Sequence, residues 1–77
     1  MADGDLMVIR VAQAIAEARN ERNWRPHVAA ARAAIAAMRE PTFGMLDAAT
    51  VGLPDWGYLP EEWQMMIDHV LSEQVTR

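Results

Sequence analysis

The 77-residue chain contains no cysteine, no lysine, a single serine and only five aromatic residues. Without cysteine, disulfide scaffolds, thiolate catalysis and cysteine-bound zinc are excluded. No stretch approaches the roughly 18 uninterrupted apolar residues that predict a membrane-spanning helix. The first residues include Asp3 and Asp5 instead of the basic region that is typical of a targeting signal. The expected location is therefore the cytoplasm, and no membrane partner is expected.

A chain of this length has room for one domain, which is expected to span residues 1–77. Domains this small bury only about 60% of the surface that their unfolded chains expose. Of the 40 hydrophobic residues 14 are alanine, which leaves 26 larger apolar side chains for a core. That number suffices for thin helical packing but not for an enzyme with a deep pocket. A marginally stable domain, or one that is stabilised by a partner, is expected.

Charge is divided unevenly along the sequence, whose formal net charge is −4. Residues 1–40 hold six arginines and five carboxylates, whereas residues 41–77 hold six carboxylates and one arginine, Arg77. The second part is therefore an acidic surface, which would repel nucleic acid and attract a basic protein.

Apolar residues at helical spacing predict four helices, over residues 5–20, 26–40 and 42–49 and from Pro60 onwards. The expected apolar stripes are Val8, Val11, Ala12, Ile15 and Ala18 in the first helix, Val28, Ala31, Ile35 and Met38 in the second, and Trp63, Met66, Ile67, Val70 and Leu71 in the last. No strand-like alternation is long enough to predict a sheet. The predicted fold is all-α, a compact small bundle of about four helices.

Capping residues and prolines mark where these helices begin. Asp3 or Asp5 is expected to cap the first helix, and Thr42 the short third one. Pro26 and Pro60 suit the first turn of a helix, where the missing amide hydrogen would have no partner in any case.

Alanines four residues apart line two faces of the second predicted helix, at positions 29, 33 and 37 and at positions 30 and 34. Such small-residue ridges let another helix approach closely. Packing within the monomer is the expected use of the ridges. The alternative is the seam of a homodimer through this Ala-rich helix.

Elimination leaves no catalytic residue to assign. The only serine, Ser72, shares a helix face with His69, but a terminal exposed helix provides neither an oxyanion hole nor protection from water. His27 and His69 fall on separate helices with no carboxylates at ligand spacing, so no metal or cofactor is expected. The chain is not expected to be an enzyme.

The turn between the first two helices is rich in arginine. It contains Arg19, Arg22, Trp24 and Arg25. Arginine beside an aromatic ring can combine phosphate contact with base stacking. Three arginines are few, however, and Glu17 and Glu21 stand among them, so nucleic acid is not expected as a partner. The alternative is that these arginines pair with the acidic half while Trp24 anchors the turn to the core.

An acidic and aromatic stretch is the strongest candidate for an interaction surface. Its residues are Asp55, Trp56, Tyr58, Glu61 and Glu62. Tryptophan and tyrosine are enriched at interface hot spots, and flanking carboxylates steer basic partners. The alternative is that Trp56 and Tyr58 close the small core, and the sequence does not separate these two roles.

Three segments carry a resemblance to a known group of proteins: VIRVAQAIAEA at 8–18, ARAAIAAMREPT at 31–42 and WQMMID at 63–68. They resemble segments of small uncharacterised alphaproteobacterial proteins that are often found in phages and prophages. Phe43 and Gly44 depart from the pattern, because relatives often have a polar residue or alanine there. That group has no catalytic motif to transfer.

A tiny, acidic, all-helical protein in such a context is similar to anti-CRISPR proteins, which bind a host nuclease or surveillance complex and act by occlusion. The resemblance implies a non-enzymatic inhibitor in the host cytoplasm, with a Cas effector as its partner. The acidic and aromatic stretch would be its binding surface, and Trp24 with the nearby arginines a second patch. Two alternatives remain open, a small phage structural or assembly protein and a nucleic-acid-binding regulator that uses Arg19, Arg22 and Arg25.

Overall fold

The computed structural model describes residues 6–75, which form four α-helices and one short 3₁₀ helix. The elements are α1 (Met7–Ala18), the 3₁₀ helix η2 (Arg25–His27), α2 (Val28–Ala37), α3 (Phe43–Ala49) and α4 (Leu59–Leu71). No strand occurs within residues 6–75, so the all-α prediction is confirmed. None of the helices in this range combines the length and the apolar character that crossing a bilayer requires.

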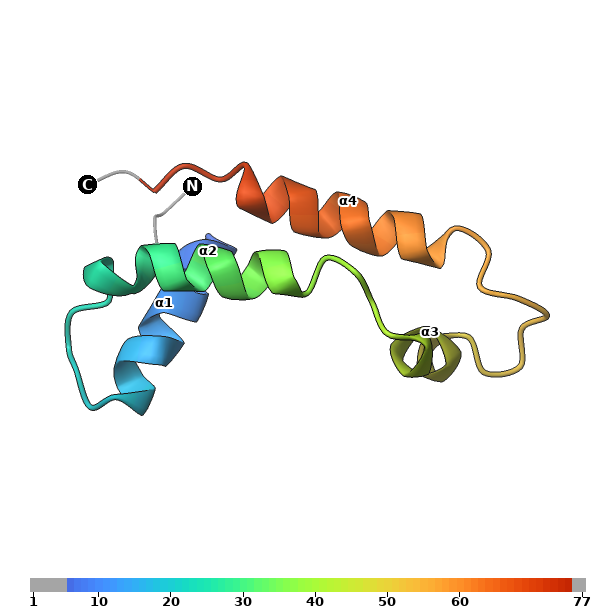
Figure 1. Ribbon diagram of the computed structural model, residues 1–77, viewed down its shortest axis with the longest axis horizontal. Helices are drawn as coiled ribbons and strands as arrows, with labels where there is room; N and C mark the ends of the chain where they lie inside the picture. The colour runs from blue at the N-terminus through green and yellow to red at the C-terminus, as the bar shows by residue number, and fades with distance from the viewer. Residues whose placement is uncertain (1–5, 76–77) are drawn as a thin grey trace.

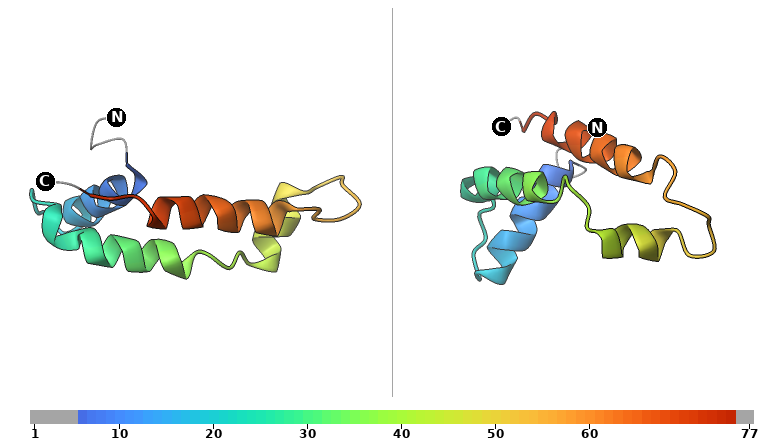
Figure 2. Two further views of the ribbon diagram at one scale, coloured as in Figure 1. Left: turned by 90° about the horizontal axis from the view of Figure 1, so that it is seen from above. Right: turned by 45° about the vertical axis from the view of Figure 1, so that its right-hand side comes forward.

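The helices are arranged along an elongated outline (Figures 1 and 2). α2 and α4 run antiparallel along the long axis, α1 crosses α2 near one end, and α3 stands apart near the other. The molecule measures 46 × 25 × 18 Å, and its radius of gyration is 14.9 Å, against about 11.5 Å for a compact chain of this length. The packing expected of all four helices is therefore limited to three of them.

Two regions can be distinguished on this basis. The body consists of α1, η2, α2, α4 and the segment 72–75, and the arm consists of residues 42–58, which include α3. The arm is distinguished from the body because α3 has seven residues of which Leu46 alone is buried, while its other large apolar side chains, Phe43 and Met45, are exposed.

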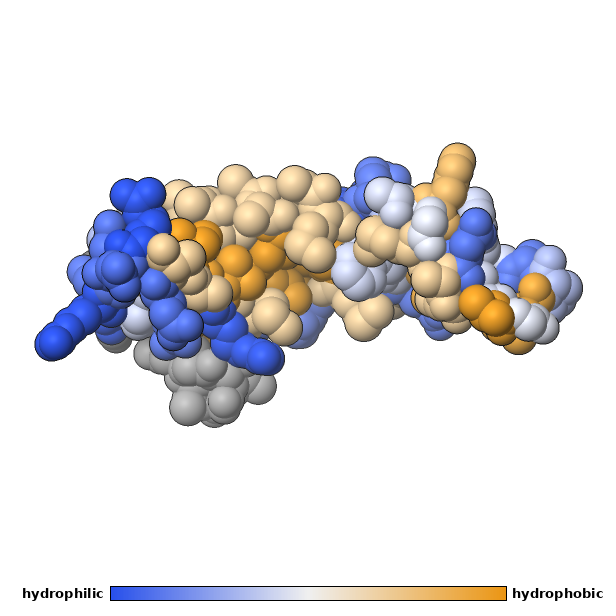
Figure 3. All heavy atoms as spheres, turned by 90° about the horizontal axis from the view of Figure 1, so that it is seen from below, coloured by the Kyte–Doolittle hydropathy of each residue, from blue (hydrophilic) through white to orange (hydrophobic). Residues whose placement is uncertain are grey.

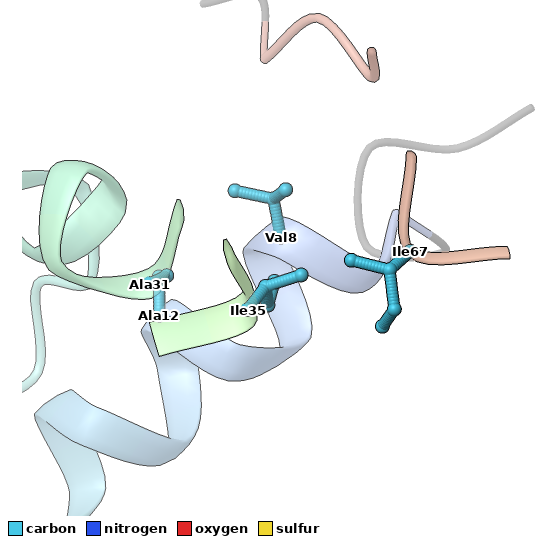
Figure 4. Close-up of a cluster of buried hydrophobic side chains, with 5 residues drawn as sticks. All are labelled: Val8, Ala12, Ala31, Ile35 and Ile67. Carbon is cyan, nitrogen blue, oxygen red and sulfur yellow. The ribbon is translucent and has the colours of Figure 1, made fainter. Parts of the chain in front are cut away.

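The core of the body lies where three helices meet (Figure 4). Its buried side chains are Val8 and Ala12 from α1, Ala31 and Ile35 from α2, and Ile67 from α4. Ala12 and Ala31 are completely buried, and their small size lets α1 and α2 approach closely. All five residues belong to the apolar stripes predicted from the sequence.

Other members of those stripes lie elsewhere. Met66, which was expected to be buried, is 57% exposed, so that expectation was wrong. Met38 and Ala18, which complete the apolar stripes predicted for the second and first helices, are exposed as well. α2 ends at Ala37, which leaves Met38 beyond the helix, and no helix covers the side of α4 that bears Met66. Ile9 and Ala16, which the stripe on α1 did not include, are buried.

The alanine ridges of α2 are exposed at all five positions, 29, 30, 33, 34 and 37. The expectation that they pack within the monomer is wrong. The physical reason is that α1 and α4 both pack on the face of α2 that bears Ala31 and Ile35, which leaves the ridges in solvent.

Most predicted helix starts agree with the structure. The hydroxyl of Thr42 accepts a hydrogen bond from the amide of Met45 at 3.1 Å, which confirms the cap of α3. Pro60 is the second residue of α4. Pro26 lies in η2, which leads directly into α2, and so it precedes that helix instead of lying in its first turn.

The first turn of α1 is capped by a residue near the C-terminal end of the described chain. Asp3 and Asp5, the predicted caps, lie outside the described residues, and Leu6 at the N-cap makes no side-chain cap. Instead, the amide of Val8 donates to Oε1 of Glu73 at 3.2 Å. A carboxylate at this position satisfies a free amide of the first turn and complements the helix dipole.

Arg32 fixes the same C-terminal segment from α2. Its Nη1 donates to the carbonyl of Leu71 at 3.0 Å, and its Nη2 to the carbonyl of Glu73 at 2.6 Å. These carbonyls belong to the last residue of α4 and to a residue just beyond it, where the helix provides no amide to pair with them. A single guanidinium therefore joins α2 to the segment that caps α1.

Candidate functional site

The predicted site residues fall at two opposite ends of the molecule (Figure 1). The acidic end comprises the loop 50–58 and the first turn of α4, and it carries Asp55, Trp56, Tyr58, Glu61 and Glu62. The basic turn comprises residues 19–27 between α1 and α2, and it carries Arg19, Arg22, Trp24 and Arg25. The two sets lie near opposite ends of the 46 Å axis, so they do not form one site.

The loop of the acidic end folds through local turns. Gly52 and Gly57 have φ angles of 84° and 57°, which L residues with a side chain adopt at a cost. Oδ1 of Asp55 accepts a hydrogen bond from the amide of Gly57 at 2.8 Å. This aspartate turn directs the chain from the loop into α4.

Trp56 ties the loop to α3. Its ring stacks on Phe43 with the centroids 5.3 Å apart, and its indole nitrogen donates to Oδ1 of Asp47 at 2.9 Å. Trp56 is half-buried by these contacts, which lie within the arm and not in the core of the body. Its role in this structure is to shape the acidic end.

Tyr58 differs from Trp56 in its exposure. It is 80% exposed, and Val51 and Leu53 of the same loop are 83% and 63% exposed. Tyr58 therefore does not close the core, which answers the question that the sequence left open for this residue. Three large side chains at one end of a small protein are available for contact with another molecule.

The carboxylates of the acidic end have no basic partner among the described residues. Within residues 6–75, no arginine or histidine nitrogen lies within 4.0 Å of a carboxylate oxygen of Asp55, Glu61 or Glu62, and the same holds for Asp47 on the neighbouring α3. Glu61 and Glu62 stand in the first turn of α4, where the helix dipole stabilises negative charge. The end therefore presents uncompensated negative charge beside exposed apolar side chains.

One arginine of the basic turn, Arg19, forms its ion pair within the turn. Asn20 adopts a left-handed conformation with φ 59° and reverses the chain, which brings Glu21 back towards Arg19 and forward towards His27. Nε of Arg19 lies 3.2 Å from Oε2 of Glu21, and Nε2 of His27 lies 2.5 Å from Oε1. The hydrogen bonds with His27 and then Arg19 lower the pKa of Glu21 below its ordinary value. The prediction that these arginines pair with the acidic half is wrong for Arg19, whose partner lies within the turn.

The guanidinium of Arg25 packs over the indole ring of Trp24 in a cation–π contact. The guanidinium carbon of Arg25 lies 4.5 Å from the centroid of the Trp24 ring, and Trp24 packs against the core of the body. This agrees with the prediction that Trp24 anchors the turn. An indole held between the core and a guanidinium is poorly placed to stack on a nucleic-acid base, and of the three arginines Arg22 and Arg25 remain exposed.

Ser72 and Asp68, which flank His69 on α4 and at its end, are engaged in structural contacts. The hydroxyl of Ser72 donates to the backbone carbonyl of His69 at 2.6 Å and so completes the end of α4. Asp68 binds Arg39 through two hydrogen bonds of 2.8 and 3.1 Å. Within the described range, no three His, Asp or Glu side chains are grouped in a way that could hold a metal ion.

A groove of about 330 Å³ between α1, α2 and α4 was missed from the sequence. It is lined by Met7, Val11, Ile35, Met38, Trp63, Met66, Ile67 and Val70. Figure 3 shows apolar surface across the middle of the face seen from below, with hydrophilic surface at one end and a mixture of hydrophilic and apolar surface at the other. The sequence signal was the recurrence of methionine, whose flexible thioether suits adaptable contact surfaces as well as cores.

No family model matches the chain, and neither the curated proteins nor the solved structures contain a match. The resemblance of three segments to small phage-associated proteins therefore stays a prediction.

Proposed function

We propose that the protein is a non-enzymatic interaction protein whose acidic end docks on a basic surface of another protein. The observation that carries this proposal is the combination, at one projecting end, of the exposed Tyr58 with carboxylates that lack a basic partner in residues 6–75. Tyrosine supplies a large contact area with few rotatable bonds, and the carboxylates supply long-range attraction.

The arm favours docking in a second way. Trp56 stacked on Phe43 and bonded to Asp47 holds the loop in shape before any partner arrives. A preorganised loop loses less conformational freedom on binding, so more of the contact energy contributes to affinity.

The specific form of the proposal is a phage-encoded inhibitor of the anti-CRISPR kind, which acts in the host cytoplasm by occluding a Cas effector. Its support is the small size, the acidic second half and the segment resemblance described above. Cas effectors of the Cas9 type hold nucleic acid in positively charged channels, which are surfaces of the chemistry that the acidic end fits.

The test is an affinity capture followed by a titration. The tagged protein is incubated with lysate of a CRISPR-bearing alphaproteobacterium, captured proteins are identified by mass, and the leading one is purified for measurement of Kd. Recovery of a Cas subunit supports the specific form, and recovery of virion components supports the alternative, a phage structural or assembly protein.

Variants locate the binding surface. Tyr58→Ala is expected to weaken binding by about tenfold or more, because truncation of a hot-spot aromatic costs about 2 kcal/mol or more. Asp55→Asn keeps an oxygen for the turn to Gly57, so the triple change Asp55→Asn, Glu61→Gln and Glu62→Gln removes charge with little effect on shape. The matched control is Glu17→Gln, an exposed carboxylate on α1. Equal affinity of all these proteins would contradict the assignment of the acidic end.

A further inference from the structure

A hollow lies between α3 and α4, beside the acidic end. Its volume is about 140 Å³, and its lining consists of Met45, Leu46 and Ala49 from α3 and Leu59 and Trp63 from α4. Leu59 belongs to the first turn of α4, so the hollow adjoins the carboxylates of that turn. Met45 and Ala49 are exposed, which makes the hollow accessible from solvent.

The lining of this α3–α4 hollow suits an apolar group. Its one nitrogen-bearing side chain is that of Trp63, and the indole nitrogen already donates to the carbonyl of Met38 at 2.7 Å. A lining without a free polar side chain favours an apolar occupant over water. A cavity of about 150 Å³ with aliphatic and aromatic walls holds a molecule of benzene. The hollow therefore has room for one side chain of the size of leucine or phenylalanine.

Negative charge stands at the edge of the hollow. Leu59, Glu62 and Trp63 share one face of α4, because residues three and four apart lie on the same side of a helix. Glu62 is exposed, and within residues 6–75 no arginine or histidine nitrogen lies within 4.0 Å of its carboxylate. Glu61 in the same turn adds charge of the same sign. A basic residue next to an inserted apolar side chain would find a complementary charge there.

From these observations we infer that the α3–α4 hollow receives one apolar side chain from a basic segment of the partner protein, in which arginine or lysine flanks that apolar residue. The inference rests on the proposed function, because it names the part of a basic partner that the acidic end recognises. The hollow selects the apolar residue, and the carboxylates select its neighbours. The combination discriminates against segments that are only basic or only apolar.

The test measures binding of a short synthetic peptide in which one central leucine is flanked by arginines. The full chain, labelled with ¹⁵N, is titrated with the peptide, and the signals of the Ala49 amide and the Trp63 indole are expected to shift. A second peptide with alanine in place of the leucine is expected to bind about tenfold more weakly, because most of the apolar contact is lost. A third peptide with glutamine in place of the arginines is expected to bind more weakly than the first.

A matched pair of variants tests the hollow itself. Ala49→Leu fills the hollow and is expected to bind the leucine peptide about tenfold more weakly than wild type does, while it binds the alanine peptide equally well. Ala48→Leu is the control, because it makes the same substitution at an exposed neighbouring position of α3 that does not line the hollow. This control is expected to bind both peptides as wild type does. Circular dichroism verifies that each variant is folded, and Ala49→Met repeats the test if Ala49→Leu unfolds.

Three results would overturn the inference. They are the absence of binding of the leucine peptide, equal affinity of wild type for the leucine and alanine peptides, and equal affinity of wild type and Ala49→Leu for the leucine peptide. A molar mass above 8.6 kDa that Ala49→Leu restores to that of the monomer would make a second copy the occupant and would also overturn it.

The proposed function is judged separately, from the Kd of the captured partner. A partner that binds Ala49→Leu as tightly as wild type, but the triple charge variant more weakly, would exclude the hollow and still support the acidic end. Equal affinity for all these variants would contradict both.

Discussion

The body and the arm both contain helices with apolar residues, but different contacts stabilise each region. In the body, side chains from three helices share one core, and hydrogen bonds join residues far apart in sequence, such as Val8 with Glu73 and Arg32 with Leu71. In the arm, Leu46 is the one residue that is buried, and hydrogen bonds such as that of Trp56 with Asp47 span nine residues or fewer.

The difference shows that a segment can keep a defined conformation through contacts among its own residues, without being packed into the core of the body. The arm keeps its shape through a capped short helix, an aromatic stack and an aspartate turn, all within residues 42–58. The arm faces the body at the start of α4, where Met45, Leu46 and Ala49 of α3 and Leu59 and Trp63 of α4 line a hollow of about 140 Å³, and of the arm's residues Leu46 alone is buried. Regions with few buried contacts open at a lower free energy than the core does. We therefore expect the body to determine the stability of the chain.

The largest expected effect is that of Ile35→Ala in the body. Ile35 is 4% exposed in the shared core, and truncation of such a residue costs about 2–5 kcal/mol. A chain of this length has a total free energy of unfolding of roughly 4–12 kcal/mol, so a large part of the stability would be lost. Urea denaturation followed by circular dichroism measures the effect. A cost as small as that of Ala33→Ser, an exposed change on the same helix, would contradict the assigned core.

Arg32→Gln is expected to have the next largest effect. The change removes a charged donor from two carbonyls, of Leu71 and Glu73, and hydrogen bonds to charged groups contribute about 1.5–3 kcal/mol. The same denaturation experiment gives the loss in stability, and faster exchange of the Val8 amide would show that the segment bearing Glu73 has detached. Arg10→Gln, an exposed change on α1, is the control and should leave both measurements unchanged.

Leu46→Ala sharpens the comparison, because it removes a buried aliphatic side chain, 4% exposed like Ile35, from the arm. If the arm is tied only weakly to the body, the main unfolding transition should shift by much less than it does for Ile35→Ala, because the cavity lies in the arm and the core of the body is unchanged. Hydrogen exchange should instead accelerate selectively at residues 43–49. A shift as large as that of Ile35→Ala would mean that body and arm unfold as one unit.

The smallest expected effect is an acid sensitivity of the ion pair between α4 and the end of α2. The hydrogen bond from Arg39 lowers the pKa of Asp68 below its ordinary value of 3.8, so the folded protein holds this carboxylate charged more strongly than the unfolded chain does. The stabilisation is therefore complete above pH 3.8 and is lost as the pH falls through the lowered pKa. Both side chains are exposed, so the effect is small.

Thermal unfolding of wild type and Asp68→Asn between pH 6 and pH 2.5 measures this effect. The two melting temperatures should differ at the upper end and converge at the lower end. A difference that is constant across the range would exclude the carboxylate charge as its cause.

Local features of this fold could be predicted from the sequence. Periodic apolar residues predicted the core positions Val8, Ala12 and Ala31, and the position of Thr42 before a short helical pattern predicted its cap. These features depend on residues within a turn or two of each other. The sequence also indicated the acidic end, whose exposed Tyr58 is observed.

Features that depend on distant parts of the chain could not be predicted. The cap of α1 by Glu73 joins residues 65 positions apart, and no local pattern marks it. Met66 was predicted to be buried and is exposed, because methionine suits an open groove as well as a core, and the choice depends on where the neighbouring helices end. The prediction that the alanine ridges pack within the monomer was wrong for the same reason. The helical spacing of residues shows which of them share a face of α2, but it does not show which face the other helices cover.

The hydrogen bond between Val8 and Glu73 makes the backbone nearly a closed ring, because it brings the two ends of the described chain together. In a ring, the order in which the helices are synthesised matters little to the final packing. A circular permutant could therefore join the ends with a short glycine-rich linker and begin at Leu53, in the exposed loop of the arm. In such a protein α4 would precede α1, the core would be unchanged, and the arm would become a pair of free ends.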